Sequence, residues 1–234
     1  MSDLHLHLEE HMQSSDILTD IVIGMSDGLT VPFALAAGLS GAVGDHVNLI
    51  WIAGIAEVAA GSIAMGLGGY LAGKTEIDHY NSELKKEYWE LEHKREREIQ
   101  EVRDVFLGWG LTKETAEEAT QEIIKDDKRW VEFMMKFELG LEEPDPKRAR
   151  KSAFNIGVSY VVGGMVPLMP YFFVSNSIDG LKMSAVITLV CLYVFGFFKS
   201  KMTGINPWWG GVKVMFIGAI AAAAAFSIAK LIQA

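Results

Sequence analysis

The sequence contains a single cysteine and no excess of positive charge, and each shortage excludes a class of protein. Cys191 cannot form an intrachain disulfide, and one thiol cannot build a thiolate metal site. The formal net charge is −9, so the chain lacks the counterion-release drive that brings basic proteins to nucleic acid. The first residues are acidic and include histidines, without the basic region and cleavage site of a secretory signal. Cations are therefore the expected ligands, and any sulfur ligand must come from methionine.

Hydrophobic and charged residues are both abundant, and they occupy different parts of the chain. Half of the residues are hydrophobic while 22% are charged, a combination that a uniform soluble domain or a bare helical bundle rarely shows. The stretch from Lys74 to Lys151 holds 16 of the 21 basic residues and 21 of the 30 acidic ones. The sequence thus divides into apolar runs and one long charged segment.

Five apolar runs are long enough to cross a bilayer as helices, which takes about 20 residues. They cover residues 17–43, 46–73, 154–174, 184–198 (starting at 181 in a longer version) and 210–232. We therefore predict an all-α membrane protein of five transmembrane helices, with a cytosolic three-helix domain inserted between the second and third spans. The expected parts are a cytosolic N-terminal tail (1–16), spans one and two (17–73), the cytosolic domain (74–151) and spans three to five (152–234).

The positions of the basic residues predict the orientation, because short cytoplasmic loops carry an excess of Lys and Arg. Four basic residues between Lys147 and Lys151 crowd against the third span. The short loop after the fourth span contains Lys199 and Lys201. The N-terminus and the charged segment are therefore expected in the cytosol, and the C-terminus on the other side of the membrane.

The charged segment is expected to form three helices. Residues 76–106 contain neither proline nor glycine, so this helix can continue directly from the second span. A second helix is expected to start after Thr112 as its N-cap, and a third to cover about residues 127–139. The residues expected to supply the core of this domain are Phe106, Trp109, Leu111, Trp130, Phe133 and Phe137.

Four glutamates of the first of these helices share one stripe: Glu87, Glu90, Glu98 and Glu101. On an ideal helix this spacing places the four side chains within an arc of about 80° around the helix axis. Neighbouring carboxylates repel one another by a few tenths of a kcal/mol per pair unless cations bridge them. The stripe therefore indicates either a metal site or a solvated helix face.

The third helix adds a thioether to these carboxylates. Met134 and Glu138 lie one helical turn apart, and Met135 is three residues from the same glutamate. Carboxylates together with a thioether suit a divalent transition metal better than calcium or magnesium, although methionine more often fills a core. The predicted metal ligands are Glu87, Glu90, Glu98, Glu101, Met134 and Glu138.

Two carboxylates lie inside apolar runs. Asp27 is about 10 residues into the first run, and Glu57 lies in the second. An ionisable group in hydrocarbon is costly unless a partner or a water-filled cavity receives it, so both are functional-site candidates. Gly28 and Pro32 are expected to open the helix beside Asp27. Met65 follows Glu57 by about two turns, within about 80° of the same face.

Three segments resemble the vacuolar iron transporter family, of the plant type with a cytosolic metal-binding domain. They are the stretch from Gly24 to Leu35 (GMSDGLTVPFAL), the glycine-rich second run, and the stretch from Thr203 to Trp208 (TGINPW). The resemblance implies a homodimer of five-helix protomers in the vacuolar membrane, which exchanges cytosolic ferrous iron for vacuolar protons and has no permanently bound cofactor. Matched by position, it implies that Asp27, Glu57 and Met65 line the transport path. It also implies that the six metal ligands named above act in the cytosol.

We therefore expect a transporter, not an enzyme, that moves Fe²⁺ out of the cytosol in exchange for protons. Mn²⁺, Co²⁺ and Zn²⁺ stay open as further cargo. Two alternatives remain at this point. A membrane-anchored di-iron carboxylate oxidase would use the charged domain as catalyst, and a metal-gated divalent cation channel would show flux without coupling to a pH gradient.

Overall fold

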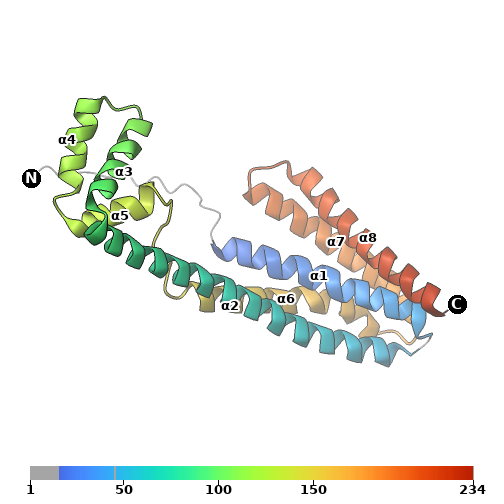
Figure 1. Ribbon diagram of the computed structural model, residues 1–234. Helices are drawn as coiled ribbons and strands as arrows, with labels where there is room; N and C mark the ends of the chain where they lie inside the picture. The colour runs from blue at the N-terminus through green and yellow to red at the C-terminus, as the bar shows by residue number, and fades with distance from the viewer. Residues whose placement is uncertain (1–15, 45, 234) are drawn as a thin grey trace, which may run out of the picture. The chain divides into compact units, whose positions relative to one another are not determined.

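The computed structural model describes residues 16–44 and 46–233, and within these ranges every regular element is an α-helix (Figure 1). The eight helices of the described residues are α1 (Asp16–Ala42), α2 (Val47–His93), α3 (Arg95–Gly108), α4 (Lys113–Ile123), α5 (Asp127–Phe137), α6 (Arg148–Phe172), α7 (Ser177–Met202) and α8 (Pro207–Gln233). They form two compact units. The first contains the described residues up to Tyr70 and from Arg150 onward, and the second is Leu71–Ala149. The all-α class is confirmed, while the predicted N-terminal tail lies outside the described residues except for Asp16.

Five of the helices, α1, α2, α6, α7 and α8, are long and apolar enough to cross a membrane, which confirms the predicted number of spans. Their ends differ from the ends of the apolar runs. The fourth span is 26 residues long because α7 begins beside Asn176, whose side chain accepts hydrogen bonds from the backbone N–H groups of Ile178 and Asp179. Caps determine where a helix begins, whereas hydropathy determines only which part of it suits the bilayer.

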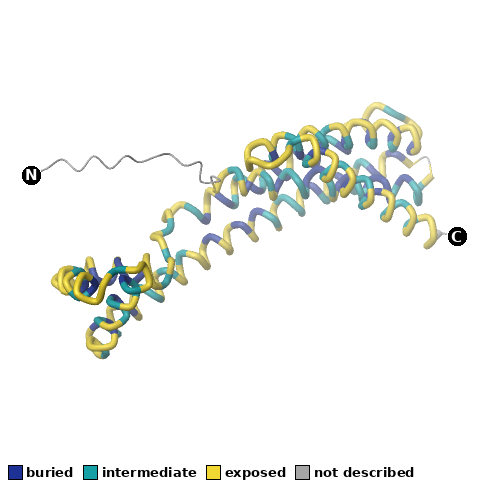
Figure 2. Tube along the Cα trace, turned by 90° about the horizontal axis from the view of Figure 1, so that it is seen from above, coloured by how far each residue is buried: buried dark blue, intermediate teal, exposed yellow. Residues whose placement is uncertain are grey.

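The outward surface of the first unit is apolar. Ile63, Phe172 and Leu231 are each more than 60% exposed, and Figure 2 shows exposed positions alternating with buried ones along these helices. Such a surface would be an aggregation hazard in water but matches the hydrocarbon of a bilayer.

Glycines let α6 pack closely against both α1 and α2. A Cβ atom added at Gly24 or Gly28 of α1 would collide with backbone carbonyls of α6, and one at Gly69 of α2 would lie 2.6 Å from the Ile156 Cδ1 atom. Helices in lipid associate through such close van der Waals packing. The first span does not open at Gly28 and Pro32, because α1 is helical through both residues, although Pro32 has no backbone N–H to donate to the Gly28 carbonyl.

The second unit surrounds its own hydrophobic core, which contains Phe106, Trp130 and Phe133 as expected. The Thr112 cap is also confirmed, since its hydroxyl oxygen accepts a hydrogen bond from the Thr115 backbone N–H. Two predicted core residues are wrong: Trp109 is 54% exposed and Phe137 46% exposed. The centres of the two rings lie 5.1 Å apart in an edge-to-face arrangement on the surface of the unit.

The long helix expected over residues 76–106 is interrupted at Lys94, where α2 ends and α3 begins. The Lys94 backbone leaves the helical region there (φ −132°, ψ 30°), and its carbonyl oxygen accepts hydrogen bonds from the backbone N–H groups of Arg97 and Glu98, the first bonds of α3. The break allows Leu91 before it and Val102 after it to enter one core. Neither glycine nor proline marks this position in the sequence, and burial of both flanks accounts for the bend.

The glycine packing gives a stability prediction. Gly24→Ala should destabilise the protein by about 1–3 kcal/mol, because its methyl group would push α6 away from α1. The matched control is Gly68→Ala in α2, where no atom lies within 4 Å of the added Cβ and the change should be neutral or slightly stabilising. Thermal unfolding of the detergent-solubilised protein measures both. Equal midpoints for the two variants would contradict the packing argument.

Candidate functional site

Glu57 of α2 is held by a hydrogen bond from a neighbouring helix of the first unit. The Tyr160 hydroxyl of α6 donates to the Glu57 Oε1 atom at 2.5 Å, while Oε2 is buried and has no hydrogen-bond partner among the described residues. Buried polar atoms are normally satisfied, because an unsatisfied one loses its interaction with water without compensation. The unpartnered oxygen makes Glu57 a candidate for binding an ion or a proton.

A groove of about 600 Å³ opens beside Glu57. Its other walls come from α1 and α8 and are largely apolar, with Val31, Leu35 and Ile228 among them. A carboxylate at such a surface needs a cation, a proton or a donor to offset its charge. The groove thus gives Glu57 a side from which a small ion can reach it.

The other two predicted path residues are placed differently. Asp27 is half-buried on α1, next to the glycine that packs against the Tyr160 backbone, and it interacts electrostatically with the Tyr160 side chain. Met65 is half-buried eight residues beyond Glu57 on α2. Tyr160 thus hydrogen-bonds Glu57 and lies near Asp27, whereas no described contact links Met65 to either carboxylate.

Sequence reasoning missed two polar groups of the spans, Tyr160 and Asp20. The Asp20 side chain of α1 is 2% exposed and accepts hydrogen bonds from the Ser152 hydroxyl at 2.8 Å and the Asn155 amide at 3.4 Å. Ser152, just before the third apolar run, recurs at helical spacing with Asn155 and Ser159 inside it, and Tyr160 follows directly. That polar stripe on an otherwise apolar helix is the signal that could have identified both residues.

In the second unit the predicted glutamates lie around the break at Lys94. Glu87 and Glu90 belong to α2, and Glu98 and Glu101 to α3, so they do not form one stripe of one helix. They still interact: Glu90, Glu101 and Glu138 all act electrostatically on Glu87. We call the five glutamates Glu87, Glu90, Glu98, Glu101 and Glu138 the acidic cluster.

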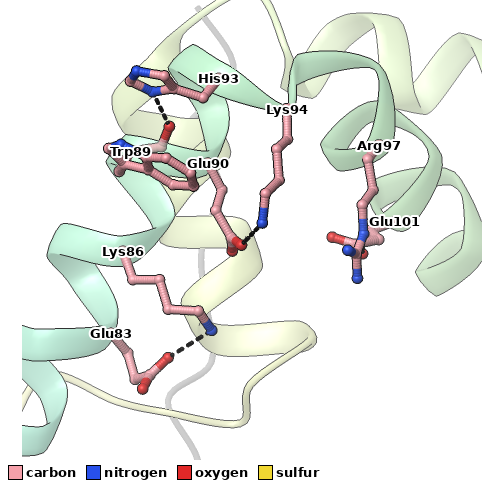
Figure 3. A network of polar contacts seen from close by, with 8 residues as sticks. All are labelled: Glu83, Lys86, Trp89, Glu90, His93, Lys94, Arg97 and Glu101. Carbon is pink, nitrogen blue, oxygen red and sulfur yellow. Dashed lines mark hydrogen bonds and ion pairs between the residues drawn. The ribbon is translucent and has the colours of Figure 1, made fainter.

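The inner and outer members of the acidic cluster have different environments. Glu87 is 4% exposed and Glu98 2% exposed, whereas Glu90 and Glu101 form ion pairs with Lys94 and Arg97 (Figure 3). Burial raises the pKa of Glu87 and Glu98 to about 7, and the neighbouring carboxylates add to this. The hydrogen bond from Lys94 lowers the pKa of Glu90 instead. The buried glutamates of the cluster therefore exchange protons near neutral pH, while Glu90 and Glu101 are paired with basic side chains.

Within the described residues, no group of three or more His, Cys, Asp or Glu side chains is arranged to hold a metal ion as it stands. The outer glutamates are turned toward basic side chains. Met134 and Met135 are each 1% exposed in the core of the second unit, so packing accounts for both. A role of Met134 as a ligand stays a prediction.

Comparison with known proteins gives the family. Residues 18–230 match the sequence profile of the VIT family. The chain belongs to the VIT family. It is 49% identical to vacuolar iron transporter 1 of Arabidopsis thaliana, over 97% of this chain and 90% of the relative. It is also 39% identical to protein CCC1 of Saccharomyces cerevisiae, over 92% of this chain and 69% of that relative.

Membership of the VIT family confirms the resemblance inferred from the sequence motifs. The Arabidopsis relative and a similar one from Tulipa gesneriana, which is 49% identical over 98% of this chain and 93% of the relative, are both named transporters. The expectation that the chain is a transporter and not an enzyme is thus confirmed, and the di-iron oxidase alternative loses its support.

The buried glutamates predict how stability depends on pH. In the unfolded chain Glu98 ionises near its ordinary pKa of 4.5, and in the folded protein near 7. The stabilisation of the neutral form is therefore fully present below about pH 4.5 and is lost as the pH rises through about 7. Glutamine stays neutral at every pH. In Glu98→Gln, the free energy of unfolding should therefore fall less between low and high pH, by on the order of 1–2 kcal/mol.

Thermal unfolding of chelator-treated protein at pH 5 and pH 8 measures the effect. Glu132→Gln is the control, because the Glu132 side chain is 62% exposed and lies outside the acidic cluster. An unchanged pH dependence in the Glu98 variant would contradict the assignment.

Proposed function

We propose that this protein carries ferrous iron from the cytosol into the vacuole in exchange for protons, as a multi-pass protein of the vacuolar membrane. The observation that carries the proposal is the Glu57 carboxylate, which lies in a candidate span with one oxygen buried and unpartnered. The similarity to proteins named vacuolar iron transporters, over nearly their whole length, supports the cargo and the membrane.

Exchange follows from the electrostatics of Glu57 and Asp27. A carboxylate that has lost most of its water must be neutralised either by a proton or by a metal ion. The Tyr160 hydroxyl holds one oxygen of Glu57 and leaves the other for the exchanging ion. Binding metal therefore releases a proton and binding a proton releases metal, which is the requirement for an antiporter. Met65 would add a thioether that favours transition metals over calcium and magnesium.

A homodimer is part of the proposal. The groove beside Glu57 is open along α1 and α8, and its walls are apolar apart from Glu57 and the half-buried Thr30. A second copy covering this face would separate the path from lipid and leave the carboxylates facing an enclosed space. Divalent transition metals, protons and the bilayer are then the other partners of the chain.

The Leu71–Ala149 unit is proposed to lie in the cytosol together with the N-terminus, with the C-terminus in the vacuolar lumen. Four basic residues between Lys147 and Lys151 support this orientation. The acidic cluster, with Met134, would capture Fe²⁺, and Mn²⁺, Co²⁺ or Zn²⁺ where these compete. Metal binding requires deprotonation of Glu87 and Glu98, so capture is itself coupled to proton release.

Transport by reconstituted protein tests the coupling. Proteoliposomes that are acidic inside should accumulate Fe²⁺ above the external concentration, and collapse of the pH gradient should abolish this accumulation, since the proton gradient is the only driving force. An imposed Fe²⁺ gradient should in turn move protons. Accumulation that persists without pH gradient or voltage would refute antiport, and flux that only equilibrates the metal would favour the channel alternative.

The intramembrane carboxylates give a sharper test. Glu57→Ala and Asp27→Ala should each reduce uptake to background, because neither alanine can exchange a proton for a metal ion. Tyr160→Phe should slow uptake about tenfold, the loss expected for one hydrogen bond to a charged group. Initial rates of Fe²⁺ uptake measure all three, with Glu132→Gln as the control. A folded Glu57 variant that transports at the wild-type rate would rule out this site.

A further inference from the structure

Basic side chains point at the acidic glutamates from both sides of the helix break (Figure 3). The Lys94 Nζ atom lies 2.7 Å from Glu90 Oε1, and the Arg97 Nε atom lies 2.8 Å from Glu101 Oε1. A third pair joins Lys86 to Glu83 at 3.3 Å, at the edge of the cluster. Glu90 on α2 and Glu101 on α3 are therefore each paired with a basic side chain of the same protein.

The Lys94 ammonium is held in place by more than its glutamate. It lies 5.2 Å from the centre of the Trp89 ring, a cation–π distance. The Lys94 backbone closes the last turn of α2 and opens the first turn of α3, because its N–H donates to the Glu90 carbonyl and its carbonyl accepts from Arg97 and Glu98. Its backbone position and these contacts thus place the Lys94 charge beside the acidic cluster.

A divalent metal ion needs several carboxylates at once, and the inner glutamates cannot supply them alone. Glu87 and Glu98 interact electrostatically with Glu90 and Glu101, so under the proposed capture all four contribute negative charge to the site. Before Glu90 or Glu101 can turn inward, its basic partner must release it. A tethered cation competes at a high effective concentration, because it is part of the same chain as the carboxylate.

We propose that Lys94 and Arg97 are tethered competitors that set the metal affinity of the acidic cluster, each holding one outer glutamate until a divalent ion displaces it. The proposal rests on the proposed capture of metal by this cluster. Lys94 and Arg97 then act as positioning residues. They raise the metal concentration needed to occupy the cluster, and they release Glu90 and Glu101 when the metal ion binds.

The sign of one measurement separates this role from a structural one. If Lys94 and Arg97 compete with metal, Lys94→Gln and Arg97→Gln should each tighten binding about three- to tenfold, because a carboxylate is freed and a repelling charge removed. If their ion pairs only stabilise the break between α2 and α3, the same variants should bind metal more weakly. Two variants are used because either one alone could disturb folding.

Titration calorimetry of the full-length detergent-solubilised protein with Co²⁺, at neutral pH and low ionic strength, provides the test. Lys94→Arg keeps the charge and should bind Co²⁺ no more tightly than the wild type. Lys74→Gln is the matched control, because the Lys74 Nζ to Asp78 Oδ1 pair has the same spacing and the same 2.7 Å length on α2 but lies outside the cluster. It should leave the affinity unchanged.

Each outcome decides a different point. Tighter binding by both Gln variants, with unchanged controls, supports the inference. Unchanged or weaker binding by both overturns it while metal capture by the wild type stands. If the wild type binds no Co²⁺, capture by the acidic cluster fails and this inference fails with it, whereas iron transport through Glu57 is judged separately by vesicle uptake.

Discussion

A carboxylate withdrawn from water needs a hydrogen-bond donor, a proton or a cation, and this requirement organises both units of the protein. In the first unit Tyr160 supplies the donor for Glu57, and one oxygen is left over. In the second unit burial leaves Glu87 and Glu98 with raised pKa values while Lys94 and Arg97 neutralise their outer neighbours. The same exchange between protons, cations and carboxylates is therefore available in two different surroundings.

The hydrogen bond at Glu57 depends on backbone packing. Gly61 lies one turn beyond Glu57 on α2, and a Cβ atom there would be 2.5 Å from the Tyr160 hydroxyl oxygen. Gly28 provides the same room on α1, where α6 carries the Tyr160 backbone. Glycines on two helices thus let one tyrosine of a third helix reach the carboxylate. Small residues in these spans serve the site as well as the stability of the bundle.

The sequence allowed the helical class, the five spans and the Thr112 cap to be predicted, because run length, hydropathy and capping are local properties. The break at Lys94 is not local, since it depends on burying Leu91 and Val102 in one core. Tyr160 is not marked by the rule that identifies Asp and Glu in apolar runs, because a tyrosine lies in hydrocarbon without a formal charge. The exposed positions of Trp109 and Phe137 show that aromatic composition does not determine which rings a small core can enclose.

The two surroundings differ in how much water the exchanging ion must lose. The Lys94 and Glu90 side chains are 38% and 16% exposed, so a metal ion can replace the ammonium while both stay partly hydrated. The free Glu57 oxygen is buried, and a cation that reaches it must give up most of its hydration shell. Under the proposed function, the metal ion first meets these partly hydrated outer glutamates and loses more water only when the buried Glu87 and Glu98 join them. Under the proposed function, the Glu57 and Tyr160 pair is then a second place where the ion must lose water, inside a candidate membrane span.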